Sequence, residues 1–159
     1  MSTITTVAVL GAGQMGAGIA QAVALGGYSV RLYDVAAAQL PLAQGRIAAS
    51  LARGVGRGAT TQGQADEALA RVTTVDTIVE AVTGADLVIE AAVEDEAVKK
   101  AVFAELTPHL SAEALLASNT SSISITRLAS STDRPDRFVG LHFMKPAPVM
   151  KLEIGRAHV

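Results

Sequence analysis

The sequence contains no cysteine and no tryptophan, and only 3 phenylalanines and 2 tyrosines among 159 residues. The lack of cysteine excludes disulfides, thiolate metal sites and a cysteine nucleophile, and it agrees with a reducing cytosol, so we expect a cytoplasmic protein. With so few aromatic side chains and a formal net charge of -2, neither base stacking nor an electrostatic footprint for nucleic acid is indicated. We therefore expect neither a metal site nor a nucleic-acid partner.

Long apolar runs are missing as well. Glycine, glutamine, arginine or aspartate interrupts every apolar stretch before it approaches the roughly 20 residues that cross a bilayer, so no membrane partner is expected. The N-terminal MSTITT carries no positively charged side chain and does not have the pattern of a signal peptide. What the chain does have is alanine, valine, leucine and isoleucine in numbers that allow one domain to bury a core.

Short apolar segments alternate with alanine-rich segments along the whole chain. Residues 7–10, 29–33, 72–75, 85–90, 114–117 and 138–142 predict strands, and residues 14–25, 36–53, 64–70, 77–83, 94–110 and 123–129 predict helices. The stretch GVGRGATTQG at 54–63 predicts a loop, which makes its flanking helices a hairpin inserted between strands. This order predicts an α/β fold with a doubly wound, mostly parallel sheet.

The segment VAVLGAGQMGAGIAQ places Gly11, Gly13 and Gly16 in a G-x-G-x-x-G pattern between the first predicted strand and the first predicted helix. In this context the first glycine allows a tight turn, the second lets a pyrophosphate approach the backbone, and the third lets helix and strand pack closely. Gln14 and Met15 would present free amides at the helix N-terminus. The pattern therefore predicts a dinucleotide site.

Asp34 ends the second predicted strand, 18 residues after Gly16. An acid at this place accepts hydrogen bonds from the adenosine ribose hydroxyls and repels a 2′-phosphate, so we expect NAD rather than NADP. The glycines at 54–58 follow a predicted helix instead of a strand, and we interpret them as a loop.

Three further stretches narrow the interpretation: DLVIEAAVEDEAVK (86–99), ASNTSS (117–122) and GLHFMKPAPVMKL (140–152). Together with the glycine pattern, they resemble the NAD-binding domain of the L-3-hydroxyacyl-CoA dehydrogenases, a family that includes 3-hydroxybutyryl-CoA dehydrogenases. The resemblance implies a Rossmann-type fold and the reversible oxidation of an L-3-hydroxyacyl-CoA to the 3-ketoacyl-CoA, with NAD taking the hydride, in fatty-acid or related metabolism. It also implies a helical C-terminal domain, absent from this chain, that carries a homodimer interface.

The resemblance assigns His142 as the catalytic base, and an imidazole titrating near neutrality suits both directions of the reaction. It assigns Ser121 to the substrate oxygen and the nicotinamide region, and Asn119 to the shape of the same loop. For the neighbouring Ser122 and Ser124, a turn that bonds its own backbone remains the alternative. We interpret His109 and His158 as structural.

The resemblance also implies further binding residues. Glu94 and Lys99 align with family positions that contact NAD, and Ser50 and Arg57 correspond to a CoA-binding serine and lysine, although glycines surround Arg57 where the family is richer in lysine. The family commonly has asparagine near the nicotinamide where this chain has Lys145. A cation there predicts altered handling of cofactor or substrate. The alternatives to the dehydrogenase are a non-catalytic NAD-binding module and a related dehydrogenase of a non-CoA hydroxyacid such as gulonate.

The last residues suggest a boundary between a domain at 1–152 and a tail at 153–159. In the family, a glutamate twelve residues after the histidine orients the imidazole; Ile154 stands there in this chain, and we expect Glu153, one residue early, to be out of register. IGRAHV is also what ATCGGAAGAGCACACGTC, part of a common sequencing adapter, encodes. We therefore expect 153–159 to be non-native and this chain to have little or no activity by itself, and the genomic sequence after Leu152 tests that expectation.

Overall fold

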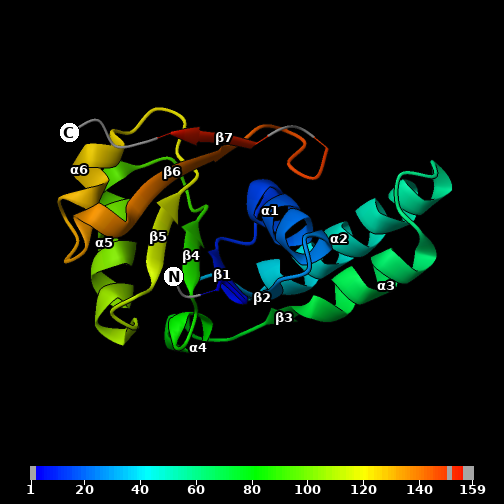
Figure 1. Ribbon diagram of the computed structural model, residues 1–159, viewed down its shortest axis with the longest axis horizontal. Coiled ribbons are helices and arrows are strands. Elements are labelled where there is room, and N and C mark those ends of the chain that lie inside the picture. The colour runs from blue at the N-terminus through cyan, green and yellow to red at the C-terminus, as the bar shows by residue number, and fades with distance from the viewer. Residues whose placement is uncertain (1–2, 150–151, 156–159) are drawn as a thin grey trace.

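The computed structural model describes residues 3–149 and the backbone of 152–155. The described elements form one sheet in the order β3-β2-β1-β4-β5-β6-β7 with helices on both sides (Figure 1). Neighbouring strands from β3 to β6 are parallel, and β7 is antiparallel to β6. The prediction of a doubly wound, mostly parallel sheet is confirmed. Within the described residues, no helix is both long enough and apolar enough to cross a membrane.

The strands are β1 (Thr6–Leu10), β2 (Ser29–Tyr33), β3 (Val72–Thr74), β4 (Leu87–Glu90), β5 (Leu115–Ser118), β6 (Phe138–Phe143) and β7 (Leu152–Gly155). The α-helices are α1 (Gln14–Leu25), α2 (Gln39–Gly56), α3 (Gln62–Arg71), α4 (Ile78–Val82), α5 (Glu96–Leu106) and α6 (Ile125–Ala129), and 3-10 turns span Thr107–His109 and Pro135–Arg137.

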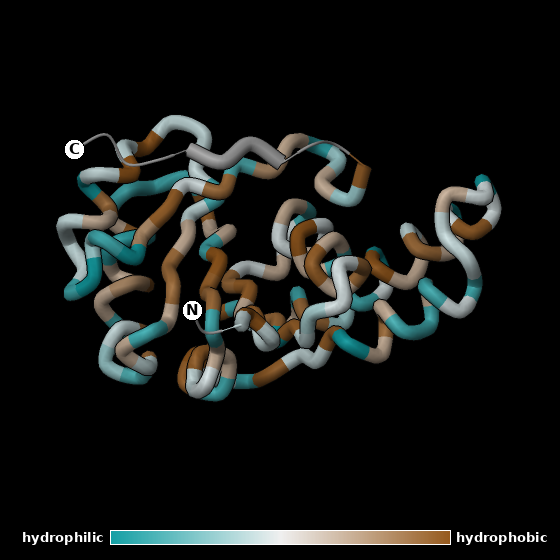
Figure 2. Tube along the Cα trace, viewed as in Figure 1, coloured by the Kyte–Doolittle hydropathy of each residue, from teal (hydrophilic) through white to brown (hydrophobic). Residues whose placement is uncertain are grey.

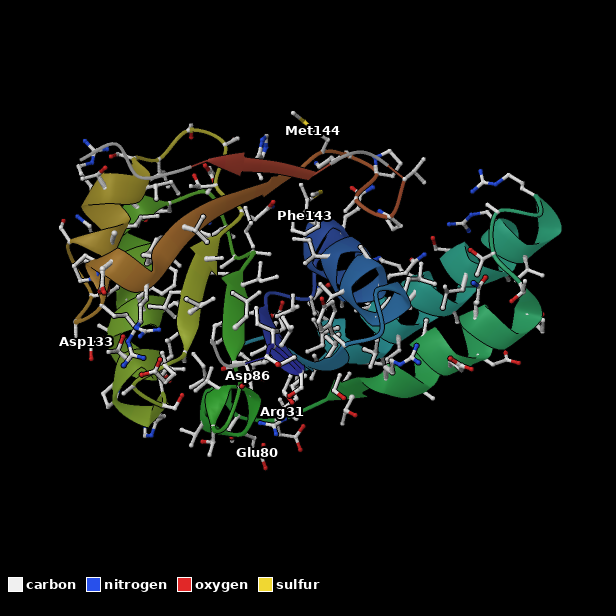
Figure 3. The ribbon with its side chains drawn as sticks, in the orientation of Figure 1. Arg31, Glu80, Asp86, Asp133, Phe143 and Met144 are labelled. Atoms are coloured by element: carbon white, nitrogen blue, oxygen red, sulfur yellow. The ribbon has the colours of Figure 1, made fainter. Side chains whose placement is uncertain are left out.

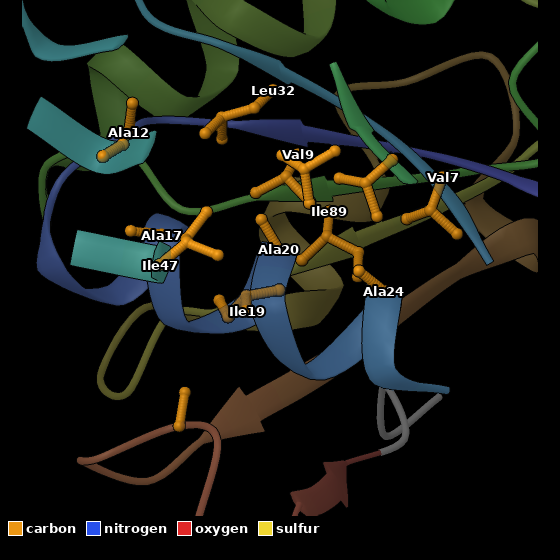
Figure 4. Packing of buried hydrophobic residues seen from close by; sticks show 14 of the residues in the cluster. Val7, Val9, Ala12, Ala17, Ile19, Ala20, Ala24, Leu32, Ile47 and Ile89 are labelled. Atoms are coloured by element: carbon orange, nitrogen blue, oxygen red, sulfur yellow. The ribbon is translucent and has the colours of Figure 1, made fainter. Parts of the chain in front are cut away.

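Alternate residues of β1 supply two separate cores. Val7 and Val9 pack with α1, α2 and α3 on one face of the sheet, whereas Ala8 and Leu10 pack with α4, α5 and α6 on the other. Figure 4 shows the first core, in which small alanines of α1 let that helix lie close to the strands. The hydropathy colouring of Figure 2 shows the same central strands as apolar, as expected for strands that are buried on both faces.

The inserted hairpin of α2 and α3 extends away from the sheet (Figure 1). α2 begins three residues later than expected because the Asp34 carboxylate accepts a hydrogen bond from the Ala36 amide at 2.8 Å and holds the chain in a turn. It then continues to Gly56, so the prediction of a loop is wrong for residues 54–56. α3 begins at Gln62 because Thr61 and Gln64 form a reciprocal capping box.

Two other boundaries differ from expectation. The helix expected over 94–110 begins at Glu96 because the Asp95 side chain accepts from the Val98 amide, and it gives way to a 3-10 turn at Thr107–His109, where Pro108 lacks an amide donor. No strand is expected from the sequence after residue 142, whereas the backbone of Leu152–Gly155 forms β7. Residues 156–159 lie outside the described part of the chain.

The close approach between the end of β1 and the first turn of α1 depends on two glycines. Gly11 has a φ of 102°, a conformation that side chains disfavour, and a Cβ on Gly16 would lie 1.7 Å from the Gly11 carbonyl oxygen. No side chain fits between these two backbones. The third glycine of the pattern therefore serves close packing, as the sequence predicts.

We expect Gly16→Ala to lower the free energy of unfolding by at least about 1–3 kcal/mol, because α1 must move away from the loop to admit the methyl group. Gly45→Ala, at an open position in α2 with no atom within 4 Å of the new Cβ, is the matched control and should raise it by roughly 0.5–1 kcal/mol. Urea unfolding of both variants measures the difference, and equal effects would contradict this account of the packing.

Candidate active site

The amino end of the sheet holds an acidic side chain that is bonded within the fold. At the amino end, Asp86 accepts hydrogen bonds from the Thr6 amide at 2.9 Å and from the Thr5 amide at 2.8 Å, which together hold the pKa of this carboxyl below its ordinary value. Figure 3 shows Asp86 there, near Arg31 and Glu80, and shows Phe143 and Met144 at the opposite end. The site is built at that opposite, carboxyl end, as expected for an open α/β sheet.

The glycine loop joins the carboxyl end of β1 to α1. Gly13 precedes the helix, and no side chain caps its first turn, so the amides of Gln14 and Met15 remain available to an anion. A Cβ on Gly13 would meet no atom within 4 Å, in contrast to Gly11 and Gly16. The space beside Gly13 is therefore open for a ligand, as a pyrophosphate site requires.

Asp34 lies next to this loop at the carboxyl end of β2. One carboxylate oxygen accepts from the Ala12 amide at 2.7 Å and the other from the Ala36 amide at 2.8 Å. These bonds fix the side chain and leave each oxygen a lone pair for a ribose hydroxyl. Arg46 of α2 approaches the same loop, with its guanidinium 3.4 Å from the Ala12 carbonyl oxygen.

A cleft of about 590 Å³ opens between the glycine loop and the residues that follow β4, β5 and β6, away from Asp34. Its size is within the range of small-molecule sites. It is lined by Gly13, Gln14, Met15, Ala91, Ala92, Val93, Glu94, Asn119, Ser121, His142, Phe143, Met144 and Lys145. The structure thus brings together residues of the glycine loop, the expected catalytic residues His142 and Ser121, and three of the other residues expected to bind the cofactor: Glu94, Asn119 and Lys145.

Glu94 organises the turn that carries Ser121. One of its oxygens accepts hydrogen bonds from the Thr120 hydroxyl, the Ser121 amide at 3.1 Å, and both the amide and the hydroxyl of Ser122 at 3.2 and 3.0 Å. Burial by itself would raise the pKa of Glu94, but the hydrogen bonds from Thr120 and Ser122 and the charge of Lys99 outweigh it, so this pKa lies below its ordinary value. The Ser122 hydroxyl thus bonds Glu94 and not its own backbone, whereas Ser124 accepts from the Arg127 amide at 3.3 Å, as the alternative expects.

A buried ion pair lies beneath Glu94. Lys99 is 1% exposed and Glu90 is fully buried, and the Lys99 ammonium is 2.7 Å from one Glu90 oxygen and 3.5 Å from Glu94. Glu90 also accepts hydrogen bonds from the Ser118 hydroxyl at 2.6 Å and the Ala92 amide at 2.7 Å. Lys99 is not among the residues that line the cleft but lies against Glu94, which does line it. The assignment of Lys99 to the cofactor stays a prediction.

Sequence reasoning missed Glu90. The signal was present, because an acid closes an otherwise apolar strand nine residues before a lysine of the following helix. An unpaired carboxylate at such a buried position would be costly, which points to a partner.

Asn119 connects this network to the histidine. The side-chain oxygen of Asn119 accepts a hydrogen bond from the backbone amide of Phe143 at 2.8 Å. The backbone amide of Asn119 donates to the Glu90 carbonyl oxygen at 2.9 Å. His142 lies one residue before the end of β6, half-buried and on the wall of the cleft. The bond from Asn119 thus holds the backbone next to the histidine.

Position 153 pairs directly with His142 in the β6–β7 ladder. Directly paired residues of antiparallel strands share one face of the sheet. The expectation that Glu153 lies out of register with His142 is therefore wrong at the level of the backbone.

The two expected CoA-binding residues line different hollows. Ser50 lies in a groove of about 390 Å³ between α1, α2 and residues 145–148, together with Arg46, Arg53 and Lys145. Arg57 lies in a separate hollow beside Thr60 and Gln64. The structure brings Ser50, but not Arg57, to the groove that adjoins the cleft.

The fold, the glycine loop and the fixed carboxylate of Asp34 define a dinucleotide-binding domain of the Rossmann class. Residues 6–157 match the family model described as "3-hydroxyacyl-CoA dehydrogenase, NAD binding domain". The chain belongs to this family, and its cofactor is NAD.

Several relatives are similar over nearly the whole chain. A 3-hydroxybutyryl-CoA dehydrogenase of Bradyrhizobium diazoefficiens is 48% identical over 95% of this chain and 51% of its own length, and a 3-hydroxyadipyl-CoA dehydrogenase of Escherichia coli is 49% identical over 96% and 32%. The crystal structure of a 3-hydroxybutyryl-CoA dehydrogenase from Escherichia coli superposes with a TM-score of 0.91 at 47% identity, covering 96% of this chain and 32% of that one. The chain therefore spans about a third to a half of the length of these relatives.

We expect Lys99→Met and Glu90→Gln each to lower the free energy of unfolding by about 3–5 kcal/mol, because each leaves a buried group without its partner. The double variant should lose less than the sum of the two. Urea unfolding of the four proteins completes the cycle, and strict additivity would show that the two groups do not interact energetically. Lys100→Met, which removes an exposed lysine of the same helix, is the control.

The lowered pKa of Glu94 makes a prediction about pH. A carboxyl whose pKa is lower in the folded than in the unfolded state stabilises the fold above the unfolded value and loses that contribution as the pH falls through the folded value. Wild type should therefore exceed Glu94→Gln in stability at neutral pH, and the gap should close in acid. Thermal unfolding across that range measures it, and a gap independent of pH would contradict the assignment.

Proposed function

We propose that the whole protein to which this domain belongs catalyses the reversible oxidation of an L-3-hydroxyacyl-CoA to the 3-ketoacyl-CoA, with NAD as the hydride acceptor. The observation that carries the proposal is a single cleft lined by Gln14 and Met15 of the glycine loop together with His142 and Ser121. The family match and the names of the relatives support the substrate class.

His142 and Ser121 can have different roles at the substrate, one in proton transfer and the other in hydrogen bonding. They extend from adjacent strands, because β5 pairs with β6 just before Ser121 and His142 enter the cleft. In the oxidation, His142 accepts the proton of the C3 hydroxyl while the C3–H bond breaks, the carbonyl forms and the hydride leaves. Ser121 donates a hydrogen bond to the reacting oxygen. NAD, when bound, supplies the acceptor for the hydride.

The charged residues of the groove that contains Ser50 favour the proposal of an anionic substrate such as a CoA thioester. Arg46, Arg53 and Lys145 line it, and no carboxylate is among its lining residues. Phosphate groups bind well to such clusters of arginine and lysine. The groove and the cleft share Gln14, Met15 and Lys145, so a thioester in the groove could extend its acyl end toward His142.

In the whole protein, we expect His142→Gln to lower turnover of NADH with acetoacetyl-CoA about 10²–10⁴-fold, because the general acid–base is lost. NADH affinity, measured by fluorescence titration, should change little, since the loop amides and Asp34 remain. His109→Gln, which alters a 3-10 turn outside the cleft, is the control and should keep full activity.

The outcomes separate the alternatives. If the whole protein binds NADH but no 3-ketoacyl-CoA oxidises the bound NADH, the proposal is contradicted and a non-catalytic NAD-binding module is favoured. Turnover of free hydroxyacids alone would favour a related dehydrogenase that does not use CoA.

A further inference from the structure

Lys145 stands out from the other charged groups of the cleft because its ammonium has no charged partner among the described side chains, residues 3–149. The side chain is exposed, and among residues 3–149 no hydrogen bond or ion pair involves it. Glu94, the carboxylate in the same cleft, is instead surrounded by hydrogen-bond donors and lies 3.5 Å from Lys99. A ligand in the cleft therefore meets an uncompensated positive charge at Lys145.

The sheet order determines which half of the cofactor meets this charge. Asp34 follows β2, on one side of β1. Ser121 follows β5, His142 lies near the end of β6 and Lys145 follows β6, all on the other side of β1. A dinucleotide that places its adenosine ribose at Asp34 and its pyrophosphate on the first turn of α1 must extend its nicotinamide toward β4–β6. The nicotinamide half thus occupies the cleft that Lys145 lines.

The two redox forms of the nicotinamide ring differ in charge at this place. The oxidised ring is cationic, and it becomes neutral when it accepts a hydride. A nearby cation repels the first form and not the second, with an energy that depends on solvent exposure. Lys145 therefore acts on the difference between NAD⁺ and NADH, in addition to any contact that both forms share.

We propose that Lys145 makes this domain discriminate between the two redox forms, weakening NAD⁺ relative to NADH and so making the bound oxidised cofactor a stronger hydride acceptor. This inference rests on the proposed use of NAD in the cleft. It assigns Lys145 a role in the redox balance of the bound couple rather than in cofactor affinity alone.

The experiment measures the ratio of dissociation constants for NAD⁺ and NADH on the present chain, with NADH titrated by fluorescence and NAD⁺ by competition. We expect Lys145→Met to lower this ratio by about threefold to tenfold at low ionic strength, and less at high salt, which screens an exposed charge. A tenfold change corresponds to about 30 mV for a two-electron couple. Lys145→Arg should keep the wild-type ratio, and Lys145→Glu should lower it further.

Lys100→Met removes one exposed lysine outside the cleft and should leave the ratio unchanged. The inference is overturned if Lys145→Met alters both affinities by the same factor, or if Lys145→Arg and Lys145→Met give the same ratio. Failure of the folded wild-type chain to bind either form would overturn the proposed cofactor site and this inference with it. Circular dichroism of every variant checks the fold.

Discussion

The ion pair between Glu90 and Lys99 is the contact on which the half of the cleft proposed for catalysis depends. Both groups are withdrawn from water, so each is tolerated only because of the other and of the hydrogen bonds that Ser118 and Ala92 add. Lys99 also faces Glu94, whose carboxylate gathers the amides and hydroxyls of the turn after β5. A buried charge pair at the end of β4 thereby fixes a loop that is far away in sequence.

A different kind of contact holds the glycine loop, where we expect the cofactor. There the constraint is steric, because Gly11 and Gly16 let the backbones of β1 and α1 meet without intervening side chains. Asp34 then ties the loop to β2 through the Ala12 amide. Close packing thus positions the loop proposed for the pyrophosphate, after β1, while electrostatic and hydrogen-bonding contacts position the turn proposed for catalysis, after β5. The strand β4, which carries Glu90, lies between β1 and β5 in the sheet.

Local patterns predicted most of the fold. The segment of β2 was predicted to the residue, and the glycine loop was recognised from its place between a strand and a helix. His142, Ser121 and Asn119 came from the family resemblance; they line one cleft in the structure, and their roles stay predictions. What the sequence did not reveal is set by contacts between distant segments. The burial of Lys99, the role of Glu90 and the separation of Ser50 from Arg57 follow from how α5 and α2 pack, which no local periodicity encodes. The start of α2 was missed because the Asp34 side chain competes with the helix for backbone donors.

Lys145 lies between the cleft that contains His142 and the groove that contains Ser50. It lines both the cleft and the groove. With the cofactor and substrate placed as proposed, its charge would act on the nicotinamide in the cleft and on an anion in the groove. An anion that pairs with Lys145 from the groove would reduce the field in the cleft and so ease the binding of the oxidised cofactor. By linkage, the oxidised cofactor would then favour that anion in return. A single exposed cation between two cavities can therefore couple the redox form of the cofactor to occupancy of the substrate groove, without any movement of the backbone.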